Sequence, residues 1–317
     1  MTQSNTRKAV IIGCGLVGAT SAFSLMESGL FSEIALVDVN RERAEGEALD
    51  IGHGTPFYGP VEIYAGDYDD LVDADIAIIT AGTAQKPGES RLDLVQRNVA
   101  ILKSILAEFS QRPFGGILIM VSNPVDVLTY VAAKITGLPR SRVMGTGTML
   151  DSARFKSILA AHLHLDARNV HARIIGEHGD SEFPVWSMAN VSGIPLSECL
   201  RNAGIDEAEK LMERVEHEVR TSAGQIISKK GATYYGIAAS VKRLCEAIVR
   251  DEKSVMTVST VLEGEYGLSD VALSIVSVIG AEGIDSHLPA PISENEHQRL
   301  RESADALKAV IAELSLD

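Results

Sequence analysis

The stretch Ala9-Val10-Ile11-Ile12-Gly13-Cys14-Gly15-Leu16-Val17-Gly18 decides the fold. Its four leading apolar residues predict a short strand, and a helical pattern begins at Leu16 and continues to Ser28. Between them lies a GxGxxG loop. The first glycine permits a tight turn, the second lets the backbone approach a ligand, and the third lets the helix pack closely on the strand. This order of strand, glycine loop and helix predicts a parallel α/β sheet.

The loop and the next acidic residue together favour a dinucleotide. The free N–H groups at the start of the helix would face its phosphates. Asp38 follows Gly18 by 20 residues and ends the next predicted strand, where its carboxylate can accept hydrogen bonds from both ribose hydroxyls of NAD. The alternative is that the glycines serve only a turn and Asp38 caps the next helix. Arg41 and Arg43 are close enough to suggest an NADP phosphate site, but Glu42 lies between them, so we expect NAD.

Short apolar runs alternate with helical stretches through the first half of the chain. The predicted strands are Ala9–Ile12, Ile34–Val37, Val61–Ala65, Ile76–Thr80, Ile117–Val121 and Val143–Gly145. The predicted helices are Leu16–Ser28, Arg41–Ile51, Leu92–Ser110 and Val125–Ile135. The runs show little alternation of apolar and polar residues, which is typical of strands buried on both faces. We therefore expect a Rossmann-type, doubly wound parallel sheet covered by helices.

The pattern changes after Gly147, where long helices mix with alternating segments. Helices are expected near Ser152–His164, Glu207–Ser228 and Ile237–Val249, and strands near Val255–Leu262 and Val271–Val278. Ser293 and Glu296 have the spacing of a capping box and predict a surface helix that closes the chain near Leu314. We predict a dinucleotide-binding domain at 1–146 and an α+β substrate domain at 147–317, packed tightly together because no linker separates them.

Composition limits the classes of partner. The chain has 317 residues, with 29 lysines and arginines against 43 aspartates and glutamates, a net charge of −14. This charge is spread evenly, so neither nucleic acid nor a membrane surface is an expected partner. Cys14, Cys199 and Cys245 are far apart and outside any CxxC spacing, which predicts reduced thiols and no metal. No stretch is long enough for a signal peptide or a membrane span, so we expect a cytoplasmic protein.

Three residues of the second half could carry proton chemistry. Asp151 and Arg154 are three apart at the start of a predicted helix, which places them on one face. His178 lies between glycines, and histidine both donates and accepts protons near neutral pH. A buried carboxylate such as Asp151 could hold one ring nitrogen and stabilise the imidazolium. Taken alone, a loop histidine of this kind is more often structural.

Two connections in the first half follow strands at the edge where ligands bind in open α/β sheets. The segment from Gln85 to Arg91 mixes a proline, a glycine and charges before a long helix, and Arg91 either reaches a substrate or is a solvated charge. Asn123 follows another strand and precedes Pro124. Spacing does not decide whether Asn123 faces a ligand or caps the next helix.

The motifs occur together in one order and resemble those of the bacterial L-lactate dehydrogenases over essentially the whole chain. They are GCGLVG (13–18), Asp38, TAG (80–82), QKPGESRLDLVQRN (85–98), SNPVD (122–126), GTGTMLDSARF (145–155), IIGEHGDSEFPVW (174–186) and GATYYGIA (231–238). The resemblance implies reversible hydride transfer between NADH and pyruvate, giving L-lactate. It also implies a homotetramer. The second residue of GTGT is a threonine where the family often has a serine, and we attach no consequence to it.

The resemblance also assigns site residues. His178 would be the acid/base, Asp151 its orienting partner and Arg91 the residue that polarises the carbonyl. Arg154 would clamp the substrate carboxylate. The remaining substrate contacts would be Asn123, Gln85 and Thr233. The cofactor contacts would be Gly13, Gly15, Val17, Gly18, Asp38, Thr80, Ala81, Gly82 and Asn123.

Gln85 separates two related activities. Malate dehydrogenases of the same superfamily carry an arginine at this position, which pairs with the second carboxylate of oxaloacetate. A malate or broader 2-hydroxyacid dehydrogenase is the alternative, and Gln85 favours pyruvate instead. An NAD-dependent glycosidase would need a cysteine and histidine metal cluster that the cysteine spacing does not offer. A non-catalytic NAD-binding protein would not need an aspartate, two arginines and a histidine to converge.

A final expectation concerns regulation. In bacterial relatives activated by fructose 1,6-bisphosphate, an arginine two residues after the substrate clamp and a histidine on the next strand form a phosphate site at a subunit interface. The matching residues are Lys156 and His171. Lysine keeps the charge but loses the planar fork, which predicts a weaker anion site. The alternative is a surface lysine beside a strand histidine.

Overall fold

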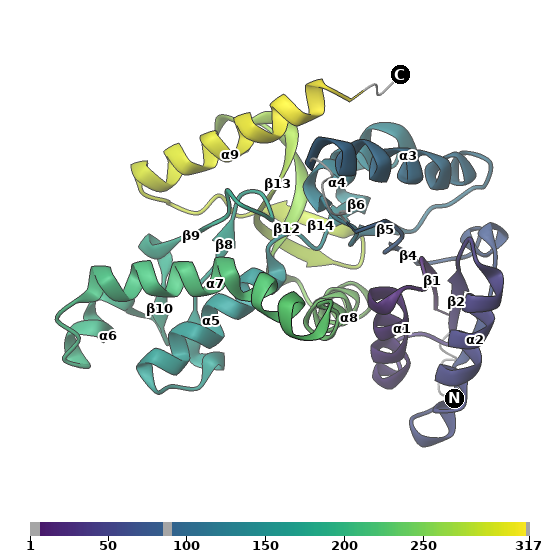
Figure 1. The fold of residues 1–317 in the computed structure, drawn as a ribbon, viewed down its shortest axis with the longest axis horizontal. Coiled ribbons are helices and arrows are strands. Elements are labelled where there is room, and N and C mark those ends of the chain that lie inside the picture. The colour runs from purple at the N-terminus through teal and green to yellow at the C-terminus, as the bar shows by residue number, and fades with distance from the viewer. Residues whose placement is uncertain (1–6, 85–90, 315–317) are drawn as a thin grey trace.

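The protein forms a nine-stranded sheet between two layers of helices (Figure 1), in a computed structural model that describes residues 7–84 and 91–314, the side chain of Arg91 excepted. Six strands are parallel: β1 (Lys8–Ile12), β2 (Glu33–Val37), β3 (Glu62–Ala65), β4 (Ile76–Ile79), β5 (Ile117–Met120) and β6 (Val143–Gly145). Their order across the sheet is β3-β2-β1-β4-β5-β6. The chain winds outward in both directions from β1 and β4, which confirms the doubly wound sheet and places a ligand crevice at their carboxyl ends.

Alternate residues of each strand enter opposite cores. Ala9 and Ile11 pack with the helices α1 (Leu16–Ser28), α2 (Arg41–Gly52) and α8 (Tyr235–Val249), whereas Val10 and Ile12 pack with α3 (Arg91–Ser110), α4 (Val125–Thr136) and α9 (Glu294–Ala312). Figure 1 shows the second group of helices above the sheet and the first group below it. Burial on both faces explains why the strands lack apolar and polar alternation.

Strands of the second half extend the same sheet. β12 (Ser254–Glu263), β13 (Ser269–Gly280) and β14 (Gly283–His287) run antiparallel, and β12 joins the parallel strands where Ser259 pairs with Gly145. The two predicted lobes therefore share one sheet. The division at 146 and 147 stays a prediction.

A third core holds the rest of the second half together. It joins α5 (Met149–Leu163), α6 (Leu196–Asn202) and α7 (Ala208–Lys230) to short strands, in the part of Figure 1 farthest from α2. The strands in this core are β7 (Val170–His171), β8 (Ile174–Ile175) and β10 (Asn190–Val191). Together with β9 (Phe183–Pro184) and β11 (Ile194–Pro195) they form two small sheets.

The long helices agree with the sequence within a few residues, and the capping box is present. The Ser293 hydroxyl accepts a hydrogen bond from the backbone N–H of Glu296 at 3.3 Å, and the Ser293 backbone N–H donates to the Glu296 carboxylate at 2.7 Å. Neither α6 nor the short strands were predicted. Among the described residues no helix has the length and apolarity needed to cross a membrane.

Candidate active site

The glycine loop has the contacts its pattern predicts. Gly13 has a φ of +104°, and a Cβ there would lie 2.5 Å from the backbone nitrogen of Ala81. A Cβ on Gly18 would collide with the carbonyl oxygen of Gly13. A Cβ on Gly15, by contrast, would meet no described atom within 4 Å, so this backbone borders open space at the N-terminus of α1. The first and third glycines thus serve packing, and the second fits close approach by a pyrophosphate.

Asp38 is held by backbone donors beside this loop. Its carboxylate accepts a hydrogen bond from the N–H of Cys14 at 2.6 Å and another from the N–H of Asn40 at 2.9 Å. Asn40, and not Asp38, caps α2. Arg41 and Arg43 pair with glutamates one helical turn further on, at 3.1 and 4.0 Å. Both cations are already engaged within α2, which fits a ribose diol better than a 2′-phosphate.

The segment after β4 lies directly against the glycine loop. The Thr80 hydroxyl donates to the Gly13 carbonyl at 2.7 Å, and the Ser122 hydroxyl donates to the Ala81 carbonyl at 2.6 Å. A Cβ on Gly82 would make only ordinary contacts with Ser122 and Asn98. The predicted cofactor residues Gly13, Gly18, Thr80 and Ala81 therefore meet at the carboxyl ends of β1 and β4.

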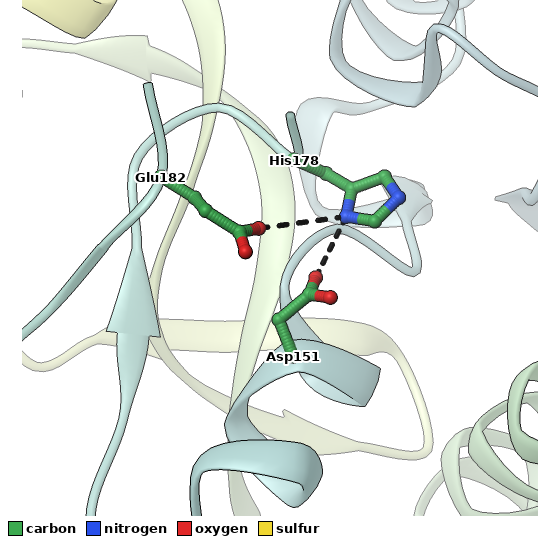
Figure 2. A group of neighbouring side chains, drawn as sticks. All are labelled: Asp151, His178 and Glu182. Carbon is green, nitrogen blue, oxygen red and sulfur yellow. Dashed lines mark hydrogen bonds and ion pairs between the residues drawn. The ribbon is translucent and has the colours of Figure 1, made fainter. Parts of the chain in front are cut away.

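His178 and Asp151 form a close pair (Figure 2). The ring nitrogen Nδ1 of His178 lies 2.6 Å from Oδ2 of Asp151, and Arg154 donates from Nη1 to the other Asp151 oxygen at 2.6 Å. Asp151 is buried on the third residue of α5, so the carboxylate is fixed from both sides. Figure 2 shows the second ring nitrogen, Nε2, turned away from the carboxylates. A proton at Nε2 is therefore available for exchange.

A further buried acid, Asp126, binds the backbone of His178. Oδ2 of Asp126, near the start of α4, accepts a hydrogen bond from the backbone N–H of His178 at 2.7 Å. Its other oxygen accepts from the Ser259 hydroxyl on β12 at 2.6 Å. Burial raises the pKa of Asp126 to about 6, against the lowering effect of these hydrogen bonds. The loop that carries His178 is thus tied to α4 and, through Asp126, to β12.

The charges around His178 favour the imidazolium. Burial opposes a charged ring, but the Asp151 carboxylate outweighs it, and with Glu182 and Asp126 it raises the pKa of His178 to about 9. The pKa of Asp151 is lowered although burial opposes its charge, because His178 and Arg154 stabilise the carboxylate. The pair therefore rests as imidazolium and carboxylate, and it is charged for proton donation at neutral pH.

One cavity of about 170 Å³ joins the two parts of the site. It is lined by residues from the glycine loop, α5 and the segment between α7 and α8: Val17, Val121, Asn123, Thr146, Gly147, Leu150, Arg154, His178, Ala223, Ile227, Thr233 and Ile237. Asn123 makes no cap, since Pro124 precedes the first residue of α4 without a side-chain hydrogen bond. The structure therefore places Asn123 on the cavity lining, and its contact with a ligand stays a prediction.

Two predicted residues cannot be placed. Gln85 lies outside the described residues, and Arg91 begins α3 with its side chain outside them as well. Asn98, to which no sequence pattern assigned a role, has a buried side chain that bridges the two connections. Its amide donates to the carbonyls of Thr83 and Asn123 at 3.1 and 2.8 Å, and its oxygen accepts from the Thr83 N–H at 2.9 Å. An asparagine on the otherwise apolar buried face of an amphipathic helix was the available signal.

The expected anion residues lie apart from this site. Lys156 lines a cavity of about 400 Å³ together with Arg173 and Arg243. Burial and the neighbouring Arg173 lower the pKa of Lys156. His171 is exposed on β7 and does not line that cavity. Arg173 and Arg243 are therefore the cations that the structure places at the cavity of Lys156.

Asp151, His178 and Glu182 are the residue types that bind metals, and their ligand atoms lie within 4.8 Å of one another. The arrangement does not suit a cation. Nδ1 of His178 is engaged by Asp151, and the other oxygen of Asp151 is engaged by the Arg154 guanidinium. A positive charge already occupies the place next to the carboxylate.

Comparisons with known proteins agree with this geometry. Residues 7–145 match the NAD binding domain of lactate/malate dehydrogenase, and residues 148–315 match the alpha/beta C-terminal domain of the same family. The chain belongs to the lactate/malate dehydrogenase family. This match confirms the Rossmann-type fold, the NAD cofactor and the assignment as an NAD-dependent oxidoreductase.

Its relatives carry L-lactate dehydrogenase names. The chain is 49% identical over 310 residues to L-lactate dehydrogenase from Acetivibrio thermocellus, with 98% of each chain covered. It is 48% identical over 303 residues to that of Priestia megaterium, covering 96% of this chain and 95% of the relative. The solved minor L-lactate dehydrogenase from Enterococcus mundtii is 40% identical with a TM-score of 0.95, over 98% of this chain and 99% of that one. The resemblance read from the motifs is confirmed.

Proposed function

We propose that this chain, an L-lactate dehydrogenase by family and relatives, exchanges a proton between His178 and the substrate oxygen while NAD exchanges the hydride. The observation that carries the proposal is the single cavity lined by Val17, Arg154, His178 and Thr233. Val17 belongs to the glycine loop, and the other three residues come from the second half. The cavity thus joins the cofactor loop to a proton donor and a cation.

His178 would donate the proton from Nε2 during pyruvate reduction and accept it during lactate oxidation. NAD, held by the glycine loop and Asp38, would supply the hydride in pyruvate reduction and accept it in lactate oxidation. Asp151 keeps Nδ1 of His178 engaged, which fixes the tautomer and stabilises the imidazolium before transfer. When the ring becomes neutral, the Arg154 guanidinium remains to balance the Asp151 carboxylate.

The same cavity would position a small 2-oxo acid. Arg154 would bind the carboxylate, and Asn123 would donate to the reacting oxygen. Thr233 stands with Leu150 and Ile237 on the lining and would face the methyl group. Gln85 and Arg91 complete the proposed set from the family resemblance. Gln85, at the position where malate dehydrogenases carry an arginine, favours pyruvate over oxaloacetate.

The test is His178→Asn. General acid catalysis is typically worth 10²–10⁴ in rate, so we expect kcat for pyruvate reduction to fall at least about 100-fold. The affinity for NADH, measured by fluorescence titration, should change little. His162→Asn is the matched control, because His162 pairs with Glu218 on α7 outside the cavity. A His178 variant that keeps more than about a tenth of the rate would contradict the assignment.

We also propose the finer properties that the resemblance implies. These are a cytoplasmic homotetramer, pyruvate and L-lactate as the substrate pair, and fructose 1,6-bisphosphate as an effector. The basic cavity with Lys156 and Arg173 supports an anion site of this kind.

A further inference from the structure

A second carboxyl group, that of Glu182, lies beside the His178–Asp151 pair (Figure 2). Oε2 of Glu182 is 3.8 Å from Nδ1 of His178, on the same side of the ring as Asp151. The residue is 6% exposed. Its Oε2 atom is buried and has no hydrogen-bond partner among the described residues. A buried acid whose Oε2 atom makes no hydrogen bond, beside a proton-exchanging histidine, needs a physical account.

We propose that Glu182 is a positioning residue that acts through His178. It holds a proton at neutral pH and releases it at alkaline pH, and its negative charge then keeps His178 protonated to a higher pH. The inference rests on the proposed function. It adds a third group to the pair that the family resemblance assigned, since the resemblance gave no role to Glu182.

Unequal partners decide which carboxyl keeps the proton. Asp151 is bound on one oxygen by Arg154 and on the other by His178. Glu182 makes a longer contact with His178, at 3.8 Å, and its carboxyl group interacts with that of Asp151. Two carboxylates this close do not both ionise readily. Burial, followed by the charge of Asp151, raises the pKa of Glu182 to about 8. At neutral pH the site therefore carries one negative charge on Asp151 and a neutral Glu182.

The consequence appears at alkaline pH. When Glu182 loses its proton, a second negative charge faces Nδ1 at 3.8 Å, and a nearby negative charge favours the imidazolium. His178 therefore keeps its proton to a higher pH than Asp151 alone would allow. A Glu182 that only filled space would leave the pH dependence of the reaction unchanged.

The other charged groups around His178 and Glu182 are left unchanged by a substitution of Glu182. They are Asp151 and Arg154 on α5, Asp126 on α4 and Glu177 on the loop itself. From α9, Arg299 lies over the ring of Phe183, next to Glu182 in the chain. The titrations of Glu182, Asp151 and His178 are coupled, so the measured quantity is the position of each limb of the pH profile.

The experiment compares Glu182→Gln with the unaltered chain. Profiles of kcat/KM are measured from pH 6 to 10.5, for pyruvate with NADH and for lactate with NAD. At pH 6.5 we expect pyruvate reduction within about twofold of the unaltered chain. The alkaline limb of reduction should move down by about one pH unit, a tenfold lower rate on that limb, since one unit is a factor of ten in proton affinity. The acidic limb of lactate oxidation should move down equally, because it reports the same proton.

Glu182→Met provides a second variant of similar length that removes both the proton and the charge. The same shift is expected from it, and it serves if the glutamine variant does not fold. Glu218→Gln is the matched control. The Glu218 carboxylate also lies beside a histidine, 3.2 Å from Nε2 of His162, but this pair is outside the cavity. Its profiles should superimpose on those of the unaltered chain.

Two results would overturn the inference. Limbs that do not move in either variant would show that Glu182 has no electrostatic effect on His178. A rate lowered equally at every pH would show a purely structural role. If instead the unaltered chain fails to oxidise NADH with pyruvate, the proposed function itself fails, and that result is distinct from both.

Discussion

Arg154 contacts Asp151 and also lines the substrate cavity. Its Nη1 donates to Asp151 at 2.6 Å, and the side chain is 12% exposed. We expect Arg154→Lys to raise the KM for pyruvate at least about tenfold, because an ammonium group cannot hold a carboxylate by two parallel hydrogen bonds. Initial rates with NADH measure this. Arg168→Lys, at an exposed arginine that pairs with Asp166, should leave KM unchanged. A near-normal KM in the Arg154 variant would contradict bidentate binding.

Sequence reasoning found residues whose chemistry follows from spacing or motif. Asp151 and Arg154 share a helix face at three-residue spacing, and Asp38 follows the glycine loop at the expected distance. It missed Asn98 and Glu182. Their roles depend on contacts across the chain, such as Asn98 with Asn123 and Glu182 with Asp151, and no local pattern encodes these distances. Motif strings contained both residues without showing what they touch.

The connection between β4 and α3 carries the prediction on specificity. Arg97 and Asn98 of α3 fix its first part by hydrogen bonds to Thr83, at 2.6 and 2.9 Å. We expect Gln85→Arg to raise the ratio of kcat/KM for oxaloacetate over pyruvate at least about tenfold. The guanidinium would pair with the second carboxylate and would stand unpaired beside a methyl group. Parallel assays with both substrates measure the ratio. Gln85→Met should keep the preference for pyruvate, and an unchanged ratio in the arginine variant would disprove control by this residue.

Elements with a strong period were predictable, and short ones were not. The parallel strands and long helices each bury a continuous apolar face, so the pattern repeats often enough to be read. β7 to β11 have two residues each, too few to show any period. The joining of β12 to β6 depends on one pair, Ser259 with Gly145, which lies 114 residues apart in the chain. Such a contact is set by packing of the whole sheet.

At the scale of the whole molecule, α5 links the two cavities. Leu150 and Arg154 line the active-site cavity, whereas Ser152 and Lys156 on the same helix line the basic one. Packing on α7 and on the short strands holds the helix as one rigid element. An anion that fixes one side of α5 would therefore also fix the arginine that receives the substrate carboxylate.

Fructose 1,6-bisphosphate should consequently lower the pyruvate concentration needed for half-maximal rate. Lys156 is half-buried beside Arg173, and burial together with the charge of Arg173 lowers the pKa of the lysine, so an anion would relieve a repulsion that exists without it. In a homotetramer whose dyad pairs two such clusters, binding would favour the substrate-competent assembly through its higher affinity for that state. The effect should be larger at about pH 6, where histidine side chains gain charge.

Pyruvate saturation curves with and without fructose 1,6-bisphosphate, at low and high enzyme concentration, measure this effect. Lys156→Ala should abolish the response, and Lys210→Ala, at an exposed lysine of α7 paired with Glu207, should retain it. Curves that superimpose at pH 6 at both enzyme concentrations would eliminate the regulatory site and leave the catalytic assignment intact.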